Sequence, residues 1–485
     1  MRFDPEQYRV QESPAGLATP FEHEYPDDDV SDEALRKRSH HKDEHLVAGF
    51  AALCLYGEFR FRVRSLGFGF GFGFGKGDRI HHRGFESQQS SRRLSLMTPR
   101  AASRIFVGQY SEDAVTRVAQ DLRQEMGTNA SLGFFFVTQE WRPQIEDTLE
   151  LIRLHGHVPQ LVGCSGWGVI GRKREVEQEP GFSLILLSLP PGSFVVTQID
   201  ENTVLESPGP GFWHKSTGVA PGDVRSWIIL ANPYFGGVET WLNEWSSAYP
   251  KVPVLGGLAS ARNAEIFLMR DGAISPAPLL AIAFKKGLTV VPLVSQGCHP
   301  IGNPSPITKA EENLILEIGN SPAYQALEAA FLSIPAAQRV SVRNNLFLGL
   351  AVSEYIDDYK QGDFLIRNIL GADPQIGALA VGAYPRVGQT VQFQLRDSKS
   401  ARQDLILASE AVKKKMSGPI GILLFSCAGR GKGLFGTSDH DAGTLACILG
   451  DLPLAGFFCN GEIGPVGSKT FLHGYTASAA VLCAT

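Results

Sequence analysis

The chain has 485 residues, of which 43% are hydrophobic and 20% charged, and its formal net charge is −5. This length allows about two or three domains with a sizeable core. The negative balance argues against a nucleic-acid-binding protein, which needs a basic surface. The seven cysteines form no C-x-x-C pair, so they fit free thiols in a cytoplasmic protein better than a disulfide framework.

Residues 1–96 differ from the rest of the chain. They begin acidic, become basic and rich in histidine, and then run through a Gly-Phe repeat at Gly67–Gly75. Such a repeat cannot build a packed core, so the segment predicts a disordered, low-complexity leader. Orderly sequence follows Met97, and a natural chain that starts there is the alternative. The apolar run Leu46–Tyr56 is too short to span a membrane, and the acidic residues before it are untypical of a signal or transit peptide.

The first regular elements after the leader predict a strand–helix–strand unit. Ser111 is a suitable N-cap for an amphipathic helix, because Glu112 and Asp113 follow it. Leu132–Val137 is a continuous apolar run typical of a buried strand. A second helix begins near Pro143, and a further strand ends at Cys164.

The same order occurs twice more. The second unit comprises a strand, a helix and a strand at Trp227–Leu230, Glu239–Trp245 and Pro253–Gly256. The third comprises Gly421–Phe425, a glycine-rich turn at 429–436, a helix at Asp439–Leu449 and a strand at Pro453–Gly456. Each unit is βαβ-like and its last strand contains glycine, although the pattern leaves open whether each strand pair is parallel.

Apolar runs between these units predict added antiparallel strands, at Phe182–Leu189, Leu279–Phe284, Thr289–Leu293, Phe347–Ala351, Ala378–Val381 and Thr390–Leu395. A helix at Ser321–Leu332 joins the two halves. We therefore predict an α/β fold, with α+β as the alternative, built from two related domains with mixed sheets at residues 97–320 and 321–485.

Several motifs in the right order resemble a known family. Leu161–Gly171 and Gln296–Gly302 resemble parts of the FIST N domain, and Gly362–Arg367 and Phe457–Gly464 resemble parts of the FIST C domain. The resemblance covers roughly residues 104–480. It implies a non-enzymatic sensory protein of signal transduction that binds a small ligand, with amino acids as the proposed ligands and a signalling protein as a possible partner. The family offers no catalytic residues to transfer, and the chain shows no pattern of a fused output domain.

The first candidate ligand site is Cys164, Ser165 and Gly166. Glycines at a strand end leave backbone N–H groups free for an anion such as a carboxylate, and the serine adds a hydroxyl. A plain structural turn with a buried cysteine is an equally good interpretation.

The second candidate is Gly429 and Arg430, which follow a strand and precede a helix. The segment does not match a P-loop, because Lys432 is followed by Gly433, so ATP binding is not expected. Arg430 can pair with a ligand carboxylate through two hydrogen bonds, whereas Lys432 fits a solvated loop.

The third candidate is Asn460, Gly461 and Glu462. Asn460 offers a donor and an acceptor, and Glu462 can receive an α-amino group. With Arg430, these residues would meet both ends of an amino acid. The competing interpretation is a turn, because Asn-Gly is a strong turn pair.

Other chemistry is less well supported. We expect no cofactor, and a zinc site is not expected because Cys427, Cys447, Cys459 and His440 lack ligand-pair spacing. His473 lies among apolar residues and predicts a core histidine. Cys298 and His299 are adjacent in an extended segment and should face opposite ways, so they make a poor dyad.

Two alternatives to a ligand sensor stay open. One is a thiol-dependent hydrolase or transferase that uses Cys427 or Cys164, and the other is an adaptor that binds proteins. Asp439 and Asp441 predict helix-cap or surface acids rather than a cation site.

Overall fold

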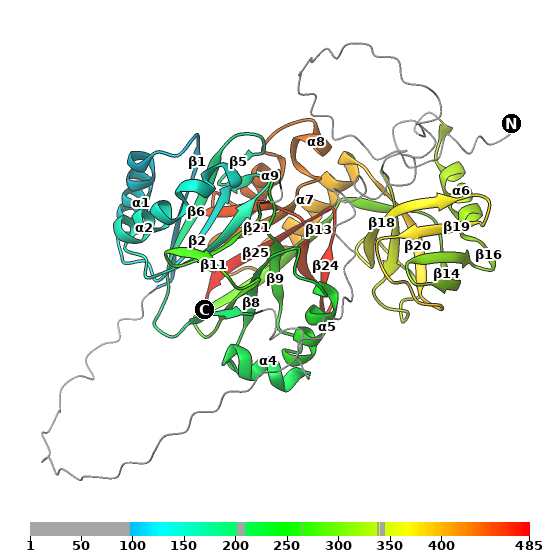
Figure 1. Cartoon of the computed structure of the whole chain (residues 1–485), viewed down its shortest axis with the longest axis horizontal. Coiled ribbons are helices and arrows are strands. Elements are labelled where there is room, and N and C mark those ends of the chain that lie inside the picture. The colour runs from blue at the N-terminus through cyan, green and yellow to red at the C-terminus, as the bar shows by residue number, and fades with distance from the viewer. Residues whose placement is uncertain (1–97, 201–208, 264, 337–338, 340–344) are drawn as a thin grey trace, which may run out of the picture.

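The described part of the chain forms three six-stranded sheets and one seven-stranded sheet, which Figure 1 shows in their arrangement. The computed structural model describes residues 98–200, 209–263, 265–336, 339 and 345–485. The predicted leader at residues 1–96 lies outside the described residues. Helices and strands alternate in mixed sheets, so the predicted α/β class is confirmed.

The first sheet has the strand order β1-β6-β2-β3-β10-β11. These strands are β1 (Arg100–Val107), β6 (Gly181–Ser188), β2 (Leu132–Thr138), β3 (Gln160–Gly166), β10 (Leu268–Arg270) and β11 (Ala273–Ser275). Helices α1 (Glu112–Met126) and α2 (Ile145–Gly156) pack on one face, and the short 3-10 helix η4 (Gln139–Gln144) precedes α2. The predicted cap is confirmed, because the Ser111 hydroxyl accepts the Ala114 N–H at 3.3 Å.

The second sheet has the order β24-β23-β9-β8-β12-β7. Its strands are β24 (Lys469–His473), β23 (Glu462–Val466), β9 (Val254–Leu258), β8 (Ser226–Ala231), β12 (Leu279–Phe284) and β7 (Phe194–Ile199). Helices α4 (Pro210–Thr217) and α5 (Val238–Ala248) cover one face. The buried tryptophans Trp213, Trp241 and Trp245 fill the space between these helices and the sheet.

The third sheet has the order β13-β25-β21-β22-β4-β5. Its strands are β13 (Leu288–Gln296), β25 (Thr476–Ala484), β21 (Pro419–Cys427), β22 (Leu454–Cys459), β4 (Val169–Gly171) and β5 (Arg174–Val176). Helices α7 (Ser398–Lys415) and α9 (His440–Leu449) cover one face. The short helix α8 (Gly431–Phe435) forms within the segment predicted as a glycine-rich turn.

All three βαβ units are confirmed, and their strands are parallel: β2 with β3, β8 with β9, and β21 with β22. Each unit carries one glycine at the same position. Gly163 pairs with Phe135, Gly256 with Ile229, and Gly456 with Leu424. A Cβ at these glycines would lie 1.7, 1.8 and 1.9 Å from the carbonyl oxygen of the paired residue. A glycine is therefore required at each of these positions, because the backbone of the neighbouring strand occupies the space that a side chain would need.

The inner faces of these three sheets share one apolar core. Its members include Phe136 from the first sheet, Leu230 from the second and Phe457 from the third. The rings of Phe136 and Phe457 stack with centroids 5.0 Å apart. The helices therefore lie outside and the common core lies inside, with β22 in contact with all the neighbouring layers.

The fourth sheet is antiparallel and barrel-like, in the order β14-β20-β17-β18-β19-β15-β16, with β14 also pairing with β15. Its strands are β14 (Cys298–Glu311), β20 (Thr390–Arg396), β17 (Leu346–Ala351), β18 (Phe364–Asp373), β19 (Ala378–Val381), β15 (Leu314–Ile318) and β16 (Ser321–Pro322). Helix α6 (Ala323–Ser333) packs against it, and Figure 1 shows this unit to one side of the other sheets.

The strands on both sides of residue 320 belong to this one barrel-like sheet. In addition, β4, β9 and β13 pair with strands from beyond residue 418. The domain bounds 97–320 and 321–485 stay a prediction, and the two stretches share three sheets.

Candidate functional site

The carboxyl ends of β21 and β22 bring two of the three predicted site segments together. Cys427 and Cys459 pair across these parallel strands, and the Ala428 N–H donates to the Cys459 carbonyl at 3.0 Å. Arg430 follows the first strand, whereas Asn460 and Glu462 follow the second. Loops at the carboxyl ends of neighbouring parallel strands are where α/β proteins bind ligands.

Arg430 is buried and forms a bidentate ion pair with Asp441 at the start of α9. Its Nε lies 2.7 Å from Asp441 Oδ2 and its Nη2 lies 2.9 Å from Oδ1. The Ser426 hydroxyl donates to Oδ2 at 2.9 Å, and His440 Nδ1 lies 2.9 Å from Oδ1. The expectation that Asp441 is a helix-cap or surface acid is wrong. Its exposure is 1%, and its carboxylate is the partner of Arg430, for which the sequence indicated none.

The pairing also settles the ionisation of Asp441. Arg430 and the hydrogen bonds from His440 and Arg430 outweigh the burial of the carboxyl group, so the Asp441 pKa lies well below its usual range. Two nitrogens of the Arg430 fork are used inside the protein. The two-bonded fork that the sequence suggested for a ligand is therefore occupied, and only the third nitrogen, Nη1, has no hydrogen bond among the described residues.

Several buried polar atoms around this pair have no hydrogen-bond partner among the described residues, and they include Arg430 Nη1, His440 Nε2, Glu175 Oε2 and Glu462 Oε1. The other carboxylate oxygen of Glu462 accepts the Thr476 N–H at 3.2 Å. Glu462 is fully buried, and burial raises its pKa well above the usual value, although the nearby Arg430 opposes that shift. Arg430 Nη1 is thus an unsatisfied charged donor and Glu462 Oε1 an unsatisfied carboxyl oxygen, and a buried group of either kind calls for an explanation.

The Cys427 thiol lies beside Glu462 and is not set up as a nucleophile. Burial and the neighbouring Glu462 raise its pKa to about 12. Burial likewise raises the pKa of the nearby Cys298 to about 12, although Arg396 opposes the shift. A thiol with such a pKa stays protonated near neutral pH.

Two glutamates that sequence reasoning missed close the outer side of the Arg430 pair. Glu175 Oε1 accepts the Ala442 N–H at 2.8 Å, and Glu177 Oε1 accepts the Lys432 N–H at 2.7 Å. Burial and the nearby Asp441 raise the Glu175 pKa to about 8. The available signal was the alternation in Arg174-Glu175-Val176-Glu177, which turns both acids to one side of an extended segment.

The first predicted segment, Cys164, Ser165 and Gly166, is buried in the interior. Cys164 belongs to the central apolar core, and the Ser165 hydroxyl accepts the Phe267 N–H at 3.1 Å. A Cβ on Gly166 would lie 2.6 Å from the Gly168 carbonyl oxygen. Among the described residues, no hydrogen bond or ion pair joins Cys164 or Ser165 to Arg430. Cys164 and Gly166 lie against Phe457 of β22, whereas Ser165 ties β3 to the segment that contains Phe267.

The remaining predicted residues lie around the strand ends. The Asn460 N–H donates to the Leu258 carbonyl at 3.1 Å and the Gly461 carbonyl accepts the Leu258 N–H at 2.8 Å, which ties this turn to β9. The Gly429 carbonyl accepts from Arg396 Nη1 at 3.4 Å. Arg396 also lies over the Tyr475 ring, 4.7 Å from its centroid. Asn460 itself is half-buried.

Three smaller predictions are borne out. His473 is a buried histidine whose Nε2 lies 3.0 Å from the Gly464 carbonyl oxygen. Cys298 is buried, whereas the adjacent His299 is half-buried and lies 2.8 Å from Asp397 Oδ2, so the two side chains do not form a dyad. Lys432 is exposed.

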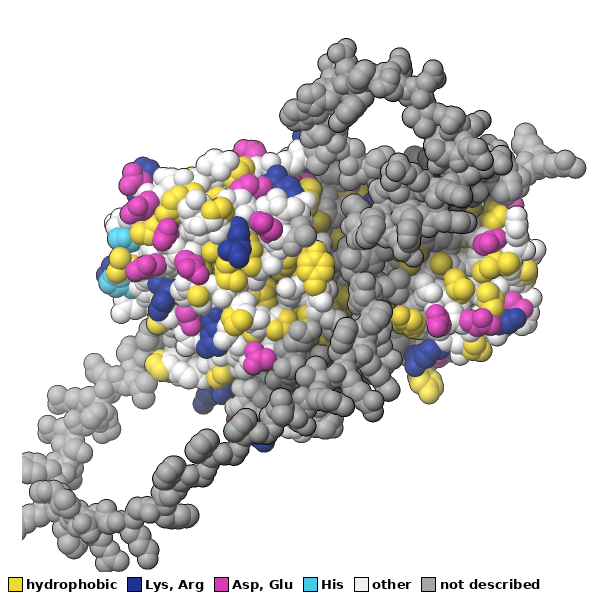
Figure 2. Space-filling model, in the orientation of Figure 1, with side chains coloured by type: hydrophobic (Ala, Val, Ile, Leu, Met, Phe, Trp, Pro, Cys, Tyr) yellow, Lys and Arg dark blue, Asp and Glu magenta, His cyan; other side chains and the backbone are white. Residues whose placement is uncertain are grey.

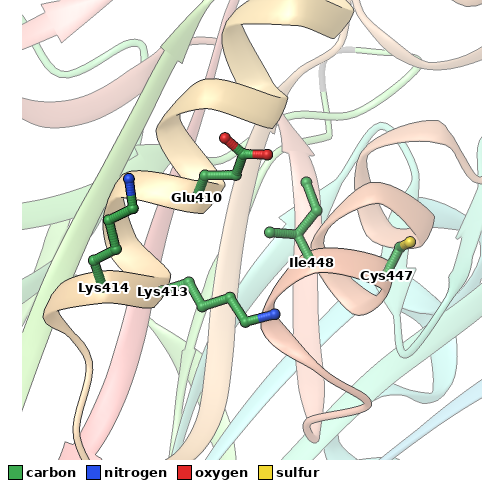
Figure 3. A pocket seen from close by; sticks show the side chains of 5 residues that line it. All are labelled: Glu410, Lys413, Lys414, Cys447 and Ile448. Carbon is green, nitrogen blue, oxygen red and sulfur yellow. The ribbon is translucent and has the colours of Figure 1, made fainter.

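One surface hollow lies away from these residues. It is an open groove of about 570 Å³ between α7 and α9, lined by Glu410, Lys413, Lys414, Cys447 and Ile448 (Figure 3). None of the predicted site residues lines it. On the surface around α1 and α2, side chains of both charges are interspersed (Figure 2). In the described ranges, no cluster of His, Cys, Asp and Glu could hold a metal ion, and no helix is long and apolar enough to cross a membrane.

Comparison with known proteins decides the family. The model of the FIST N domain matches residues 131–321, and that of the FIST C domain matches residues 323–465. The chain belongs to the FIST family. The resemblance expected from the sequence motifs is thus confirmed, and FIST domains are associated with signal transduction and small-ligand sensing rather than with a known enzyme activity.

Two mycobacterial relatives align with this chain over almost their whole length. An uncharacterized protein of Mycobacterium tuberculosis (strain H37Rv) is 35% identical over 390 residues, which cover 78% of this chain and 99% of the relative. An uncharacterized protein of Mycobacterium bovis is 33% identical over 376 residues, covering 76% of this chain and 95% of the relative. The aligned part of this chain therefore corresponds to nearly the full length of those proteins.

Proposed function

We propose that this FIST protein is a non-enzymatic sensor in the cytoplasm that binds an amino acid at the carboxyl ends of β21 and β22 and passes the bound state to a signalling partner. The observation that carries the proposal is the pair of buried, unpartnered atoms, Arg430 Nη1 and Glu462 Oε1. The free thiols among the described cysteines agree with a reducing compartment.

The chemistry of the two atoms matches the two ends of an amino acid. Arg430 Nη1 is a charged donor, which suits a carboxylate, and Glu462 Oε1 is an acceptor, which suits an ammonium group. Half-buried Asn460, at the same strand ends, can donate to a carboxylate or accept from an ammonium group. A zwitterion would satisfy both buried groups at once, whereas each of them alone is costly to bury.

Proton release follows from this assignment. Burial raises the Glu462 pKa well above its usual value, which favours the neutral acid in the free protein. A ligand ammonium group stabilises the ionised carboxylate. Amino-acid binding near pH 7 should therefore release a proton from Glu462.

The test is calorimetric titration of the full chain with each of the common amino acids. We expect saturable binding of one amino acid or of a few with similar side chains. At pH 7 the binding enthalpy should change with the ionisation enthalpy of the buffer, since a proton is released. Glu462→Gln keeps an oxygen for the Thr476 N–H but cannot ionise, so affinity should fall by about tenfold or more. Its proton release should also disappear.

Asp451→Asn is the matched control, because Asp451 is an exposed carboxylate that lies before β22, at the opposite end of that strand. Its affinity should match that of the wild type. Absence of binding by every amino acid, or binding that Glu462→Gln leaves unchanged, would overturn the proposal.

A further inference from the structure

A second hollow lies where the barrel-like sheet meets the rest of the molecule. It encloses about 360 Å³. One wall comes from β17, β18 and the loop at residues 383–389, and the other comes from α5 and β24. None of the residues at the ends of β21 and β22 lines this crevice, so it is separate from the site proposed above.

The charged side chains in the crevice are unbalanced. Arg367, Arg386 and Lys469 are cationic, and Glu239 is the one acidic residue among its lining residues. Arg386 and Lys469 are exposed. The crevice also receives the N-terminal turn of α5, whose cap residue Gly237 supplies no side-chain acceptor. Both features favour a negative ligand.

Arg367 is the buried cation of this crevice, and backbone carbonyl groups hold it in place. Its side chain is 8% exposed, and its Nη1 donates to the Ile366 carbonyl at 2.9 Å and to the Leu472 carbonyl at 3.4 Å. These bonds hold the guanidinium between β18 and β24. A buried guanidinium needs an anionic partner.

Glu239 is the present partner, with its Oε1 2.5 Å from Arg367 Nη2. Its side chain is 54% exposed, in contrast to that of Arg367. Because its carboxylate is mostly exposed, Glu239 can turn into water when another anion takes its place beside Arg367. Glu239 therefore occupies a position that another carboxylate or a phosphate could take.

The remaining lining is suited to an organic body attached to the anion. Leu242, Leu350 and Leu365 supply apolar surface, and Tyr384 and Phe471 supply aromatic rings. We propose that this crevice binds a small organic anion, a carboxylate or a phosphate ester, that displaces Glu239 from Arg367. The ligand would touch both the barrel-like sheet and the α5–β24 wall.

The experiment is calorimetric titration of the full chain at low ionic strength with phenyl phosphate, benzoate and inorganic phosphate. We expect saturable binding of phenyl phosphate or benzoate, and binding of inorganic phosphate that is at least several-fold weaker. Binding should weaken as salt is added. The relative affinity of phenyl phosphate and benzoate then distinguishes a phosphate ester from a carboxylate.

Substitutions of acidic and basic residues in the crevice should change the ligand affinity in opposite directions. Glu239→Gln removes the competing carboxylate, so affinity should rise by about three- to tenfold. Lys469→Met and Arg386→Met should each weaken binding by a similar factor, and both positions are exposed, so folding is not at risk. Lys309→Met, an exposed lysine on β14 outside the crevice, should change nothing.

Glu462→Gln should leave phenyl phosphate and benzoate binding intact, which separates this site from the amino-acid site. Absence of saturable binding by both organic anions, or affinities that Glu239→Gln and Lys469→Met leave at the wild-type value, would overturn the proposal.

Discussion

The carboxylate of Glu175 accepts the backbone N–H of Ala442 at 2.8 Å, across 267 residues of sequence. It thereby caps the start of α9, whose own N-cap residue, Asp439, makes no side-chain capping bond to it. The Asp439 carboxylate instead accepts the Glu175 N–H at 2.7 Å. This reciprocal exchange fixes β5 to α9 beside the Arg430–Asp441 pair.

Glu175 should make stability depend on pH. Its pKa is raised from 4.5 to about 8 in the folded protein, so the fold favours the protonated acid. Its contribution is fully present below about pH 4.5 and is lost as pH rises through about 8. Glu175→Gln mimics the neutral acid and should escape this loss. Between pH 5 and 7 the variant should gain about 2 kcal/mol on the wild type in urea unfolding.

The exposed Glu179→Gln is the control for that comparison, since Glu179 is an acid on the same segment. Its stability difference from the wild type should stay constant over the same pH range. A constant difference for Glu175→Gln as well would show that Glu175 is ionised in the folded protein.

His473 should make the free energy of unfolding depend on pH in the acidic range. Burial lowers its pKa from 6.5 to about 4. Its contribution is therefore present above about pH 6.5 and is lost as pH falls through about 4. The wild type should lose about 2 kcal/mol on this account between pH 8 and pH 5, and His473→Gln should not. Urea unfolding at both pH values checks this, with the exposed His157→Gln expected to behave like the wild type.

A side chain at any of the three repeated glycines should destabilise the folded protein to a similar extent. Gly163→Ala, Gly256→Ala and Gly456→Ala each place a Cβ within 2 Å of a carbonyl oxygen of the paired strand. Each should destabilise the protein by about 3 kcal/mol or more, because strand backbone must move. Gly443→Ala is the control: it lies in α9 with open space around it and should be neutral or slightly stabilising. Thermal unfolding of the four variants provides the comparison.

Cys427 should resist alkylation. Its pKa is raised to about 12, so its thiolate fraction at pH 8 is about one in ten thousand. Iodoacetamide should label the exposed Cys447 first, with peptide mass mapping as the readout. Rapid labelling of Cys427 in the folded protein would revive the thiol-dependent hydrolase or transferase.

The Arg430–Asp441 pair should show strong coupling. Arg430→Met leaves a buried carboxylate without its cation and should cost about 3–5 kcal/mol. The double variant Arg430→Met, Asp441→Leu removes both charges and should be less destabilised than the sum of the single variants. Urea unfolding of the full cycle measures this coupling, and additivity would contradict the buried ion pair.

Local patterns were sufficient for much of the fold. The runs around Phe135, Ile229 and Leu424 are continuous and apolar, so the three βαβ units could be predicted from them. Their parallel pairing could not, since it depends on which strands become neighbours. Helix α7 was missed, although Asp397 caps it by accepting the Ser400 N–H and three lysines close it. Strand β14 was missed because its prolines and Asn303 are untypical of a strand interior.

The site was predictable in part. Arg430 stood out because it follows a strand and precedes a helix, and Glu462 stood out because it follows a strand that contains the repeated glycine. The acids around Arg430 did not, because Glu175 comes from a distant segment and bonds to the Ala442 N–H, and Asp441 resembled an ordinary acid of a helix start. Burial turns such an acid into the partner of a buried cation, and burial is a property of the assembled layers rather than of the local sequence.

The central position of β25 has a consequence during synthesis. This strand lies between β13 and β21, and Gln296 of β13 pairs with Thr476, about 180 residues later. At about 5–20 residues per second, a ribosome needs on the order of ten seconds or more to make that stretch. Throughout this interval, the apolar edge of β13 is without its strand. A nascent chain held by a chaperone, rather than stepwise folding of each half, is the route that such a delay favours.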